Sequence, residues 1–335
     1  MKRLLFVLAA LAVISGAGAA PKAKAKAPAR PAAAAAPVLS AYRRTPYVGA
    51  VSLNAKTGAV LFSDDADRPA YPASVSKLMT ALLVLEDVKA GRYKFTDMVT
   101  ATEAVYKSES SWVGIKAGEK MSVNDMLTAL MVESANDVAI ALAVHSAGGL
   151  EAFVAKMNAR AKALGMNGTT YYNPNGLPPK PKYPWKHQNV STARDQSRLA
   201  LELIKNHPAI LEYTSIKTCD LIRTDYGYRT SVTRRANGGA PRTTVLAPGE
   251  KIVMALKNHN NVMVKDKLKI LNADGREAVD GLKTGYIDAG GSSVVLTGTR
   301  GGQRAIVVVL GSANAPTRDE NAARLLTDAL GALAW

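Results

Sequence analysis

The segment that decides the fold and the chemistry of this chain reads Pro72-Ala73-Ser74-Val75-Ser76-Lys77-Leu78-Met79-Thr80. Apolar residues recur at helical spacing from Leu78 onward, so we predict a helix from Ser74 to Val88. Residues i and i+3 share one face of a helix, so the Ser74 hydroxyl and the Lys77 amine can meet. A lysine accepts a proton only when it is neutral, and burial or a second cation lowers its pKa. Since serine and lysine are common, this spacing alone is a weak signal.

Strands are predicted at both ends of the chain and helices in its middle. Val48–Leu53 and Ala59–Phe62 flank a turn at Asn54–Gly58, which is typical of a hairpin. Two more strands are expected at Ser292–Thr299 and Arg304–Leu310, and helices at Ser122–Met131, Asn136–Val144, Leu150–Leu164, Thr192–Asn206 and Pro316–Leu330. The order predicts an α/β fold: one antiparallel sheet built from both ends, flanked by helices, beside a mainly helical subdomain. Residues 217–251 are less regular, and we expect an insertion there.

The N-terminal residues have the composition of a leader rather than of a domain. A basic start, an apolar run from Leu4 to Ile14 and small residues through Ala19 predict a signal peptide over residues 1–19, with an uncleaved anchor as the alternative. Residues 20–43 are mainly Ala, Pro and Lys, which cannot build a core, so we predict a disordered tether. The ordered domain is expected over residues 44–335, with the irregular insertion at about 217–251.

Composition restricts the classes of function. The 335 residues are 47% hydrophobic, enough for a real core. The 43 Lys and Arg against 27 Asp and Glu give a net charge of +16, which favours attraction to an anionic cell wall or membrane surface. No nucleic-acid recognition motif accompanies this charge, so we expect no nucleic-acid partner. Cys219 is the only cysteine, and the four histidines lack the spacing of zinc ligands, so we expect no internal disulfide, no cysteine metal cluster and no zinc motif.

Two further short patterns have chemical potential. Ser134-Ala135-Asn136 lies in a break between two predicted helices, where a loop can point into a cleft. Lys283-Thr284-Gly285 lies on a predicted strand, where it offers a cation and a hydroxyl to a carboxylate, while Gly285 leaves room for the ligand. Both patterns have copies elsewhere: Ser-x-Asn begins at Ser122, as a helix cap, and at Ser312, and Lys56-Thr57-Gly58 is interpreted as a plain turn.

Together and in this order, the three patterns are a much rarer set. The chain resembles the low-molecular-mass penicillin-binding proteins of the D-alanyl-D-alanine carboxypeptidase family (serine peptidase S11 type). The resemblance rests on residues 72–80, Glu133-Ser134-Ala135-Asn136-Asp137, Asp280-Gly281-Leu282-Lys283-Thr284-Gly285-Tyr286, Leu164-Gly165-Met166-Asn167 and Ser191-Thr192-Ala193-Arg194-Asp195. It covers roughly Tyr47 to the C-terminus and implies a β-lactamase/transpeptidase-like fold.

The resemblance also implies a role for each residue. Ser74 would be acylated by the carbonyl of D-Ala in a peptidoglycan stem peptide, with Lys77 taking its proton and Ser134 passing a proton to the leaving amine. Asn136 would hold the substrate amide, and Lys283 and Thr284 its terminal carboxylate. The backbone N–H groups of Ser74 and Tyr286 would form the oxyanion hole. The implied activity is a periplasmic serine-type carboxypeptidase, inhibited by β-lactams and without a metal or cofactor.

Two departures from the family pattern leave alternatives open. Tyr286-Ile287 replaces the frequent His-Thr after Lys-Thr-Gly. The chain ends at Trp335, without the second domain and membrane anchor of many relatives, which resembles the soluble D,D-endopeptidases that cut peptidoglycan crosslinks. We therefore expect no stable membrane anchor after signal cleavage, and an endopeptidase remains the main alternative function.

Two more distant alternatives are a class A β-lactamase and a catalytically dead wall-binding protein. A β-lactamase activates its deacylating water with a glutamate after the second motif, but no Asp or Glu occurs between Glu151 and Asp195. We therefore expect slow deacylation and lasting acylation by penicillin. A dead protein is disfavoured because every expected reactive group is present.

Overall fold

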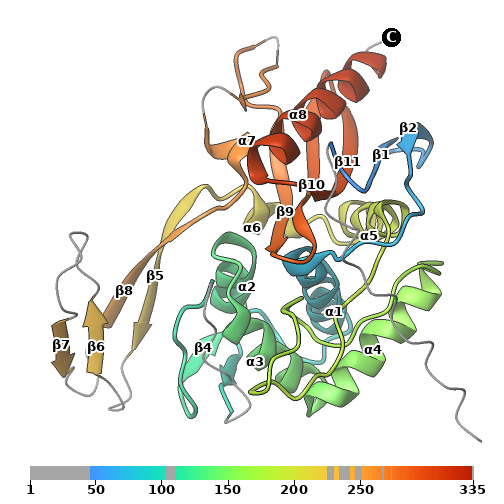
Figure 1. The fold of residues 1–335 in the computed structure, drawn as a ribbon. Helices are drawn as coiled ribbons and strands as arrows, with labels where there is room; N and C mark the ends of the chain where they lie inside the picture. Colours follow the sequence, from blue (N-terminus) through green and yellow to red (C-terminus); the bar gives the residue numbers. More distant parts are fainter. Residues whose placement is uncertain are drawn as a thin grey trace, which may run out of the picture. The chain divides into compact units, whose positions relative to one another are not determined.

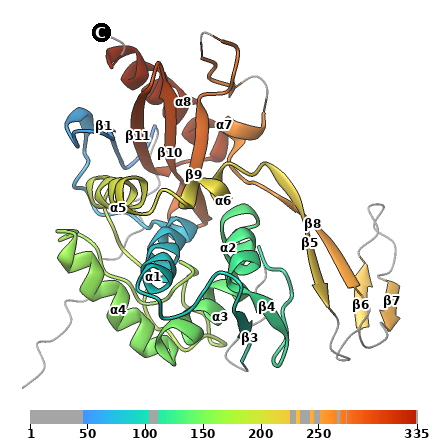
Figure 2. The same ribbon diagram turned by 180° about the vertical axis from the view of Figure 1, so that it is seen from behind.

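The computed structural model describes residues 46–102, 111–224, 230–233, 242–245, 251–265, 268–272 and 274–333. Contacts divide the chain into two units, Met1–Ala36 and Pro37–Trp335. The first unit lies outside the described residues, as do the predicted signal peptide and tether. The second unit contains every element described below, shown in Figures 1 and 2.

A five-stranded antiparallel sheet joins the two ends of the second unit. Its strands, in spatial order, are β2 (Val60–Asp64), β1 (Gly49–Asn54), β11 (Gln303–Ser312), β10 (Gly291–Arg300) and β9 (Val279–Ile287). β1 and β2 form the predicted hairpin, and β1 pairs with β11 with Gly49 opposite Leu310. The predicted sheet built from both ends is therefore confirmed.

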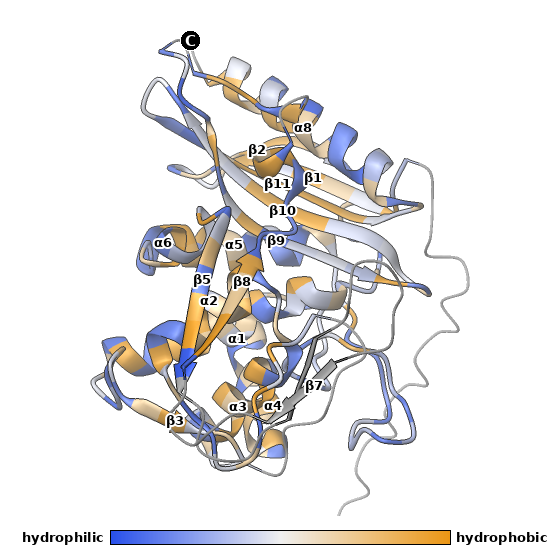
Figure 3. Cartoon of the chain, turned by 90° about the vertical axis from the view of Figure 1, so that its left-hand side faces the viewer, coloured by the Kyte–Doolittle hydropathy of each residue, from blue (hydrophilic) through white to orange (hydrophobic). Residues whose placement is uncertain are grey.

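Both faces of this sheet are covered, which explains why β11 is an almost unbroken apolar run. Val307 and Val309 pack in one core cluster with α8 (Ala315–Ala332). Ile306 and Val308 pack in another with α5 (Ala193–Asn206), because successive strand residues point to opposite faces. Figure 3 shows the hydrophobic residues along β10 and β11.

The middle of the chain forms the predicted helical region. It contains η1 (Ala73–Ser76), α1 (Lys77–Lys89), α2 (Val123–Val132), α3 (Asn136–Ala147), α4 (Leu150–Ala163) and α6 (Ile210–Thr214). The predicted first helix thus begins with a 3-10 turn. Helix α1 is buried along most of its length from Lys77 to Asp87, and α2, α3, α4 and α5 pack around it. The Ser122 side chain caps α2 by accepting from the Asp125 N–H at 3.0 Å, as predicted.

The structure adds elements that the sequence patterns did not predict. They are the paired strands β3 (Met98–Thr100) and β4 (Lys120–Ser122), and the short helices α6 and α7 (Asn261–Val264). Among the described residues no single helix is long and apolar enough to cross a membrane, although α3 and α4, bent by 85°, pass that test as a pair.

The region expected to be an irregular insertion contains strands instead. β5 (Thr218–Thr224) pairs along its whole length with β8 (Lys251–Lys257), and β6 (Thr230–Thr233) pairs with β7 (Arg242–Val245). In β8 exposed and more buried residues alternate, as in a strand with one face packed. The Arg, Thr and Gly content of the region obscured this alternation in the sequence.

Candidate active site

Ser74 lies in the tight turn η1, which the backbone of two other segments encloses. The preceding residue, Ala73, has a φ of 50°, an unfavourable conformation for a residue with a Cβ. Gly176 lies so close that a Cβ there would come within 1.9 Å of the Ala73 carbonyl oxygen. The turn is thus held in an unusual shape by its neighbours, as expected for a positioned nucleophile.

Lys77 is fully buried, and its amine lies within hydrogen-bond distance of three oxygen atoms. Its Nζ lies 2.9 Å from Ser74 Oγ, 2.6 Å from Asn136 Oδ1 and 2.9 Å from the Asn175 carbonyl oxygen. Burial lowers its pKa well below the ordinary lysine value, and the charge of Lys283 lowers it further, while Asp137 opposes the shift. The amine is therefore suited to be neutral and to take the Ser74 proton.

Ser134 lies in the connection between α2 and α3, as predicted. Its backbone has a φ of 62°, and its buried Oγ has no hydrogen-bond partner among the described residues. In the described part of the chain only Asp65, Ala73, Ser111 and Ser134 are non-glycine residues with positive φ. Ser111 and Ser134 line one cleft and Ala73 precedes Ser74, so this backbone strain concentrates at the site.

Asn136 and Asp137 hold one edge of the cleft in place through hydrogen bonds to the segment 111–115. The Asn136 N–H donates to the Ser111 carbonyl at 2.8 Å, and the Asp137 carboxylate accepts from the N–H groups of Val113 and Ile115. Burial raises the pKa of Asp137, although these backbone hydrogen bonds oppose the rise. The Asp of the Glu-Ser-Ala-Asn-Asp motif thus has a structural task that the sequence analysis did not assign.

Strand β9 brings the third pattern against the nucleophile turn. A Cβ at position 285 would lie 2.5 Å from the Pro72 carbonyl oxygen and 3.0 Å from Ser74 N. Gly285 was predicted to leave room for a ligand, but the structure shows that it leaves room for the Ser74 turn itself. Tyr286 is half exposed, and its hydroxyl donates to Asp288 Oδ1 at 2.7 Å.

Lys283 is the second buried lysine of the site. Its Nζ donates to the Thr284 carbonyl oxygen at 3.1 Å. Burial lowers its pKa to about 7, the charge of Arg318 lowers it as well, and Glu133 opposes the shift. At this pKa, Lys283 acquires a full charge most readily when an anion binds beside it.

A single open cleft of about 530 Å³ connects the three patterns. Ser74, Ser134, Thr284 and Gly285 line it directly. Lys77 and Lys283 lie behind that surface, close enough that the charge of Lys283 lowers the pKa of Lys77. All the residues that the sequence analysis selected therefore converge, although they come from distant stretches of the chain.

Several residues of the site were not found from the sequence. The other cleft-lining residues are Ser111, Glu133, Leu177, Lys257, Asn258, His259, Asn261, Tyr286, Ala315 and Arg318, of which Tyr286 alone had been selected. Asn189 lies behind the site, where its side chain bonds to Ser76 Oγ, to two backbone N–H groups and to one carbonyl. The asparagines of residues 173–189 were a possible signal, but Arg318 had none, since a lone arginine on a helix has no distinctive pattern.

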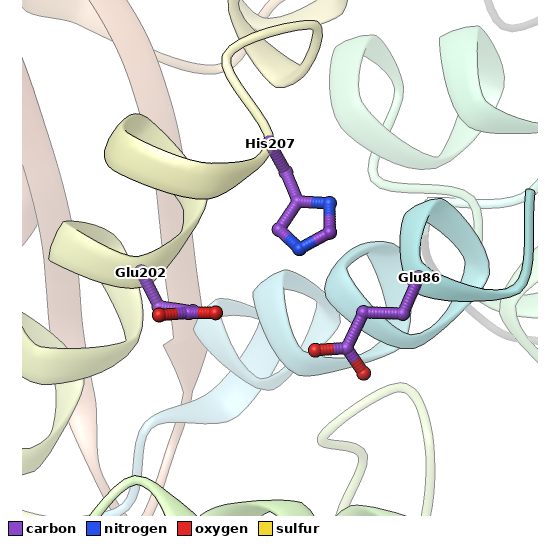
Figure 4. Close-up of side chains that lie close together, drawn as sticks. All are labelled: Glu86, Glu202 and His207. Carbon is purple, nitrogen blue, oxygen red and sulfur yellow. The ribbon is translucent and has the colours of Figure 1, made fainter. Parts of the chain in front are cut away.

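One group of side chains outside the cleft has the spacing of metal ligands. Oxygen and nitrogen atoms of Glu86, Glu202 and His207 lie within 4.8 Å of one another among the described residues (Figure 4). However, Arg160 already donates to both carboxylates at 2.6 Å. We interpret this group as an ion-pair network that links α1, α4 and α5.

The fold and the Ser-Lys-Ser cleft define a serine hydrolase of the penicillin-binding class. The sequence profile described as D-alanyl-D-alanine carboxypeptidase matches residues 48–237. The chain belongs to this family of serine peptidases. The D-alanyl-D-alanine carboxypeptidase DacF of Bacillus subtilis is 29% identical over 277 residues, covering 83% of this chain and 60% of that protein. The chain spans about three fifths of the length of the first curated relatives it matches.

Solved structures show the same fold. The D-alanyl-D-alanine carboxypeptidase DacD from Francisella tularensis superposes with a TM-score of 0.68 at 27% identity, covering 83% of this chain and 69% of that one. Penicillin-binding protein D2 from Listeria monocytogenes, in its ampicillin-bound form, has a TM-score of 0.62 at 28% identity. That match covers 84% of this chain and 96% of the Listeria protein. The expected β-lactamase/transpeptidase-like fold is thereby confirmed.

Proposed function

We propose that this protein is a serine-type D-alanyl-D-alanine carboxypeptidase that removes the terminal D-Ala of peptidoglycan stem peptides through an acyl-enzyme on Ser74. One observation carries the proposal: the Ser74 hydroxyl lies 2.9 Å from a fully buried lysine amine whose pKa is lowered well below its ordinary value. A neutral amine at that distance is an adequate general base for a serine nucleophile.

The first step forms the acyl-enzyme. Lys77 takes the Ser74 proton as Oγ attacks the carbonyl of the penultimate D-Ala. Ser134 delivers a proton to the departing nitrogen, and the C–N bond breaks. The unpartnered Ser134 Oγ, buried at the cleft surface, supports this role because it keeps a donor and an acceptor available for substrate.

The developing negative charge and the substrate's own carboxylate need separate partners. We assign the first to the backbone N–H groups of Ser74 and Tyr286, which the close approach of Gly285 to Ser74 N brings near each other. We assign the terminal carboxylate to Lys283 and Thr284, and the substrate amide to Asn136. The buried Lys283 gains charge when it meets that carboxylate, so binding and protonation support each other.

Release of the acyl group is slow for a β-lactam in this account. Water must attack the Ser74 ester, and a class A β-lactamase uses a glutamate for that step. The loop that packs behind Ser74 and Lys77 presents Asn173, Asn175 and Asn189 instead of an acid. Penicillin therefore forms a lasting adduct and inhibits the enzyme.

We also propose that the protein acts outside the cytoplasm. We infer that residues 1–19 direct export to the periplasm, that residues 20–43 form a tether, and that residues 44–335 work on the cell wall as one peptidase domain. The net charge of +16 supports contact with an anionic wall.

Fluorescent penicillin and a stem pentapeptide test this function together. We expect the wild-type protein to label stably and to release D-Ala from the pentapeptide, while Ser74→Ala does neither. Ser215→Ala changes an exposed serine on α6's C-terminal side and is the matched control, expected to behave as wild type. Equal labelling of wild type and Ser74→Ala refutes the assignment.

A further inference from the structure

The connection between α4 and α5 carries a basic surface that begins at the edge of the catalytic cleft. Figure 1 shows this connection as the long yellow-green stretch between the two helices. Leu177, near its middle, lines the cleft. Residues 178–187 follow, and we call them the basic segment because they contain no Asp or Glu. Three of their lysines are exposed, namely Lys180, Lys182 and Lys186.

Aromatic packing and prolines hold the basic segment in place. The rings of Tyr183 and Trp185 stack with their centroids 4.5 Å apart, and both side chains are buried against Ile140 of α3. Where the segment ends, Gln188 Nε2 donates to the Gly176 carbonyl oxygen at 3.0 Å. Prolines at positions 178, 179, 181 and 184 restrict the backbone further. The backbone that carries the lysines is therefore ordered before a ligand binds, which lowers the entropic cost of binding.

Two of the three lysines flank a shallow depression in the basic segment. Its volume is about 290 Å³, and its lining residues are Pro179, Lys180, Pro181, Trp185 and Lys186. No carboxylate is among these lining residues. Glu151 lines a neighbouring groove that shares Trp185 and Lys186 with the depression. Three exposed lysines against this one carboxylate give the surface a positive potential, so it complements an acidic ligand with short apolar parts.

The upstream part of a stem peptide can reach this surface from the cleft. In the proposed function Lys283 holds the terminal carboxylate, so the upstream residues leave the cleft on the other side. Leu177 lies there, because its N–H donates to Asn175 Oδ1 at 3.0 Å and the Asn175 carbonyl oxygen lies 2.9 Å from Lys77 Nζ. Lys180 is three residues beyond Leu177, a span of at most about 11 Å. The isoglutamyl carboxylate, two residues before the acylated D-Ala, has a comparable reach of about 7–11 Å.

We propose that the basic segment, through Lys180, Lys182 and Lys186, binds the carboxylates that precede the D-Ala residues of a stem peptide. The enzyme then prefers acidic stem peptides to stem peptides whose upstream carboxylates are amidated. This inference rests on the proposed function of Ser74 and adds a binding surface outside the catalytic cleft. The lysines attract the substrate and its transition state equally, so they lower KM and leave the chemical step at Ser74 unchanged.

The test compares two stem pentapeptides of equal length, one with free upstream carboxylates and one with carboxamides in their place. We expect kcat/KM for D-Ala release to be about 5- to 20-fold higher for the acidic peptide at low ionic strength. The difference should shrink at about 0.5 M NaCl, because salt screens exposed charges. Equal kcat/KM values for the two peptides overturn this inference while the proposed function stands. If neither peptide loses D-Ala and penicillin does not label the protein, the proposed function fails, and the inference fails with it.

Variants then locate the binding surface. In Lys180→Gln/Lys182→Gln/Lys186→Gln we expect the preference for the acidic peptide to fall to about twofold or less, through a higher KM for that peptide. The matched control removes the same charge from exposed lysines elsewhere, as Lys56→Gln/Lys94→Gln/Lys205→Gln, and should keep the wild-type preference. A preference that survives in the first variant, or that falls equally in both, contradicts the proposal.

Discussion

The two sides of the catalytic cleft differ in how deeply their polar groups are buried. On the Lys77 side, formed by Lys77, Asn136 and the segment around Asn175, polar groups are buried and bonded to each other. On the Lys283 side, Glu133, Lys257 and His259 remain partly or fully exposed at the cleft. The first side fixes the reacting atoms before substrate arrives, and the second leaves charge available for the substrate. The groups for reactivity and those for recognition therefore lie on opposite sides of the cleft.

The largest expected effect comes from removing the base. In Lys77→Ala we expect the second-order rate constant for penicillin acylation to fall about 10³-fold or more, because the Ser74 proton loses its acceptor. The constant is measured by stopping reactions with fluorescent penicillin at set times and quantifying the labelled protein. Lys56→Ala is the matched control, since Lys56 is the exposed lysine in the second Lys-Thr-Gly copy and should react as wild type. A Lys77→Ala rate constant within tenfold of the wild-type value would contradict the assignment of Lys77 as the base.

The second-largest expected effect is a loss of stability when the side chain of Asn189, behind the Lys77 side, is removed. In Asn189→Ala we expect the free energy of unfolding to fall by about 2–4 kcal/mol, because several buried backbone and side-chain groups lose their partner. The melting temperature should fall by about 5–15 °C, measured by calorimetry. Lys257→Ala, an exposed change on the other side of the cleft, should stay within about 0.5 kcal/mol. Equal losses in the two variants would show that the sides do not differ in rigidity.

A third prediction concerns the contact between the two sides. In Gly285→Ala the new Cβ would lie 2.5 Å from the Pro72 carbonyl and 3.0 Å from Ser74 N, so β9 or the Ser74 turn must shift. Such a shift of β9 or of the Ser74 turn should lower the rate of Ser74 acylation about 10²-fold. Gly331→Ala, where a Cβ has nothing within 4 Å, is the control. A Gly285→Ala rate equal to that of Gly331→Ala would remove the steric explanation.

The smallest effect is a pH dependence from the Lys283 side. In the proposed function, carboxylate binding needs protonated Lys283, whose pKa burial lowers to about 7. The protonated fraction is full below that pKa and is lost as pH rises through it, so kcat/KM for the pentapeptide should fall about tenfold per pH unit on the alkaline side. Lys283→Arg keeps its charge and should lose this alkaline limb, whatever its absolute activity. An alkaline limb that persists in Lys283→Arg assigns the ionisation to another group.

Local patterns predicted most of the fold and the central residues of the site. Periodicity and turn residues located the β1–β2 hairpin, the helices and strands β10 and β11, and the three motifs located Ser74, Ser134 and Lys283. The strands at 218–224 and 251–257 escaped because the Arg, Thr and Gly content of the region obscured their alternation, and the exposed face of β8 includes valine and alanine, which contrast little with its packed face. Arg318 and Asn175 escaped because their proximity arises from tertiary packing, which no local spacing encodes.

Peptide mapping of the penicillin-labelled wild-type protein by mass spectrometry tests the central claim most directly. We expect one penicilloyl group, carried by Ser74, with Ser76 and Ser134 unmodified. An adduct on Ser76 or Ser134, or an unmodified protein after prolonged incubation, would contradict the claim that Ser74 and its buried lysine form the reactive pair.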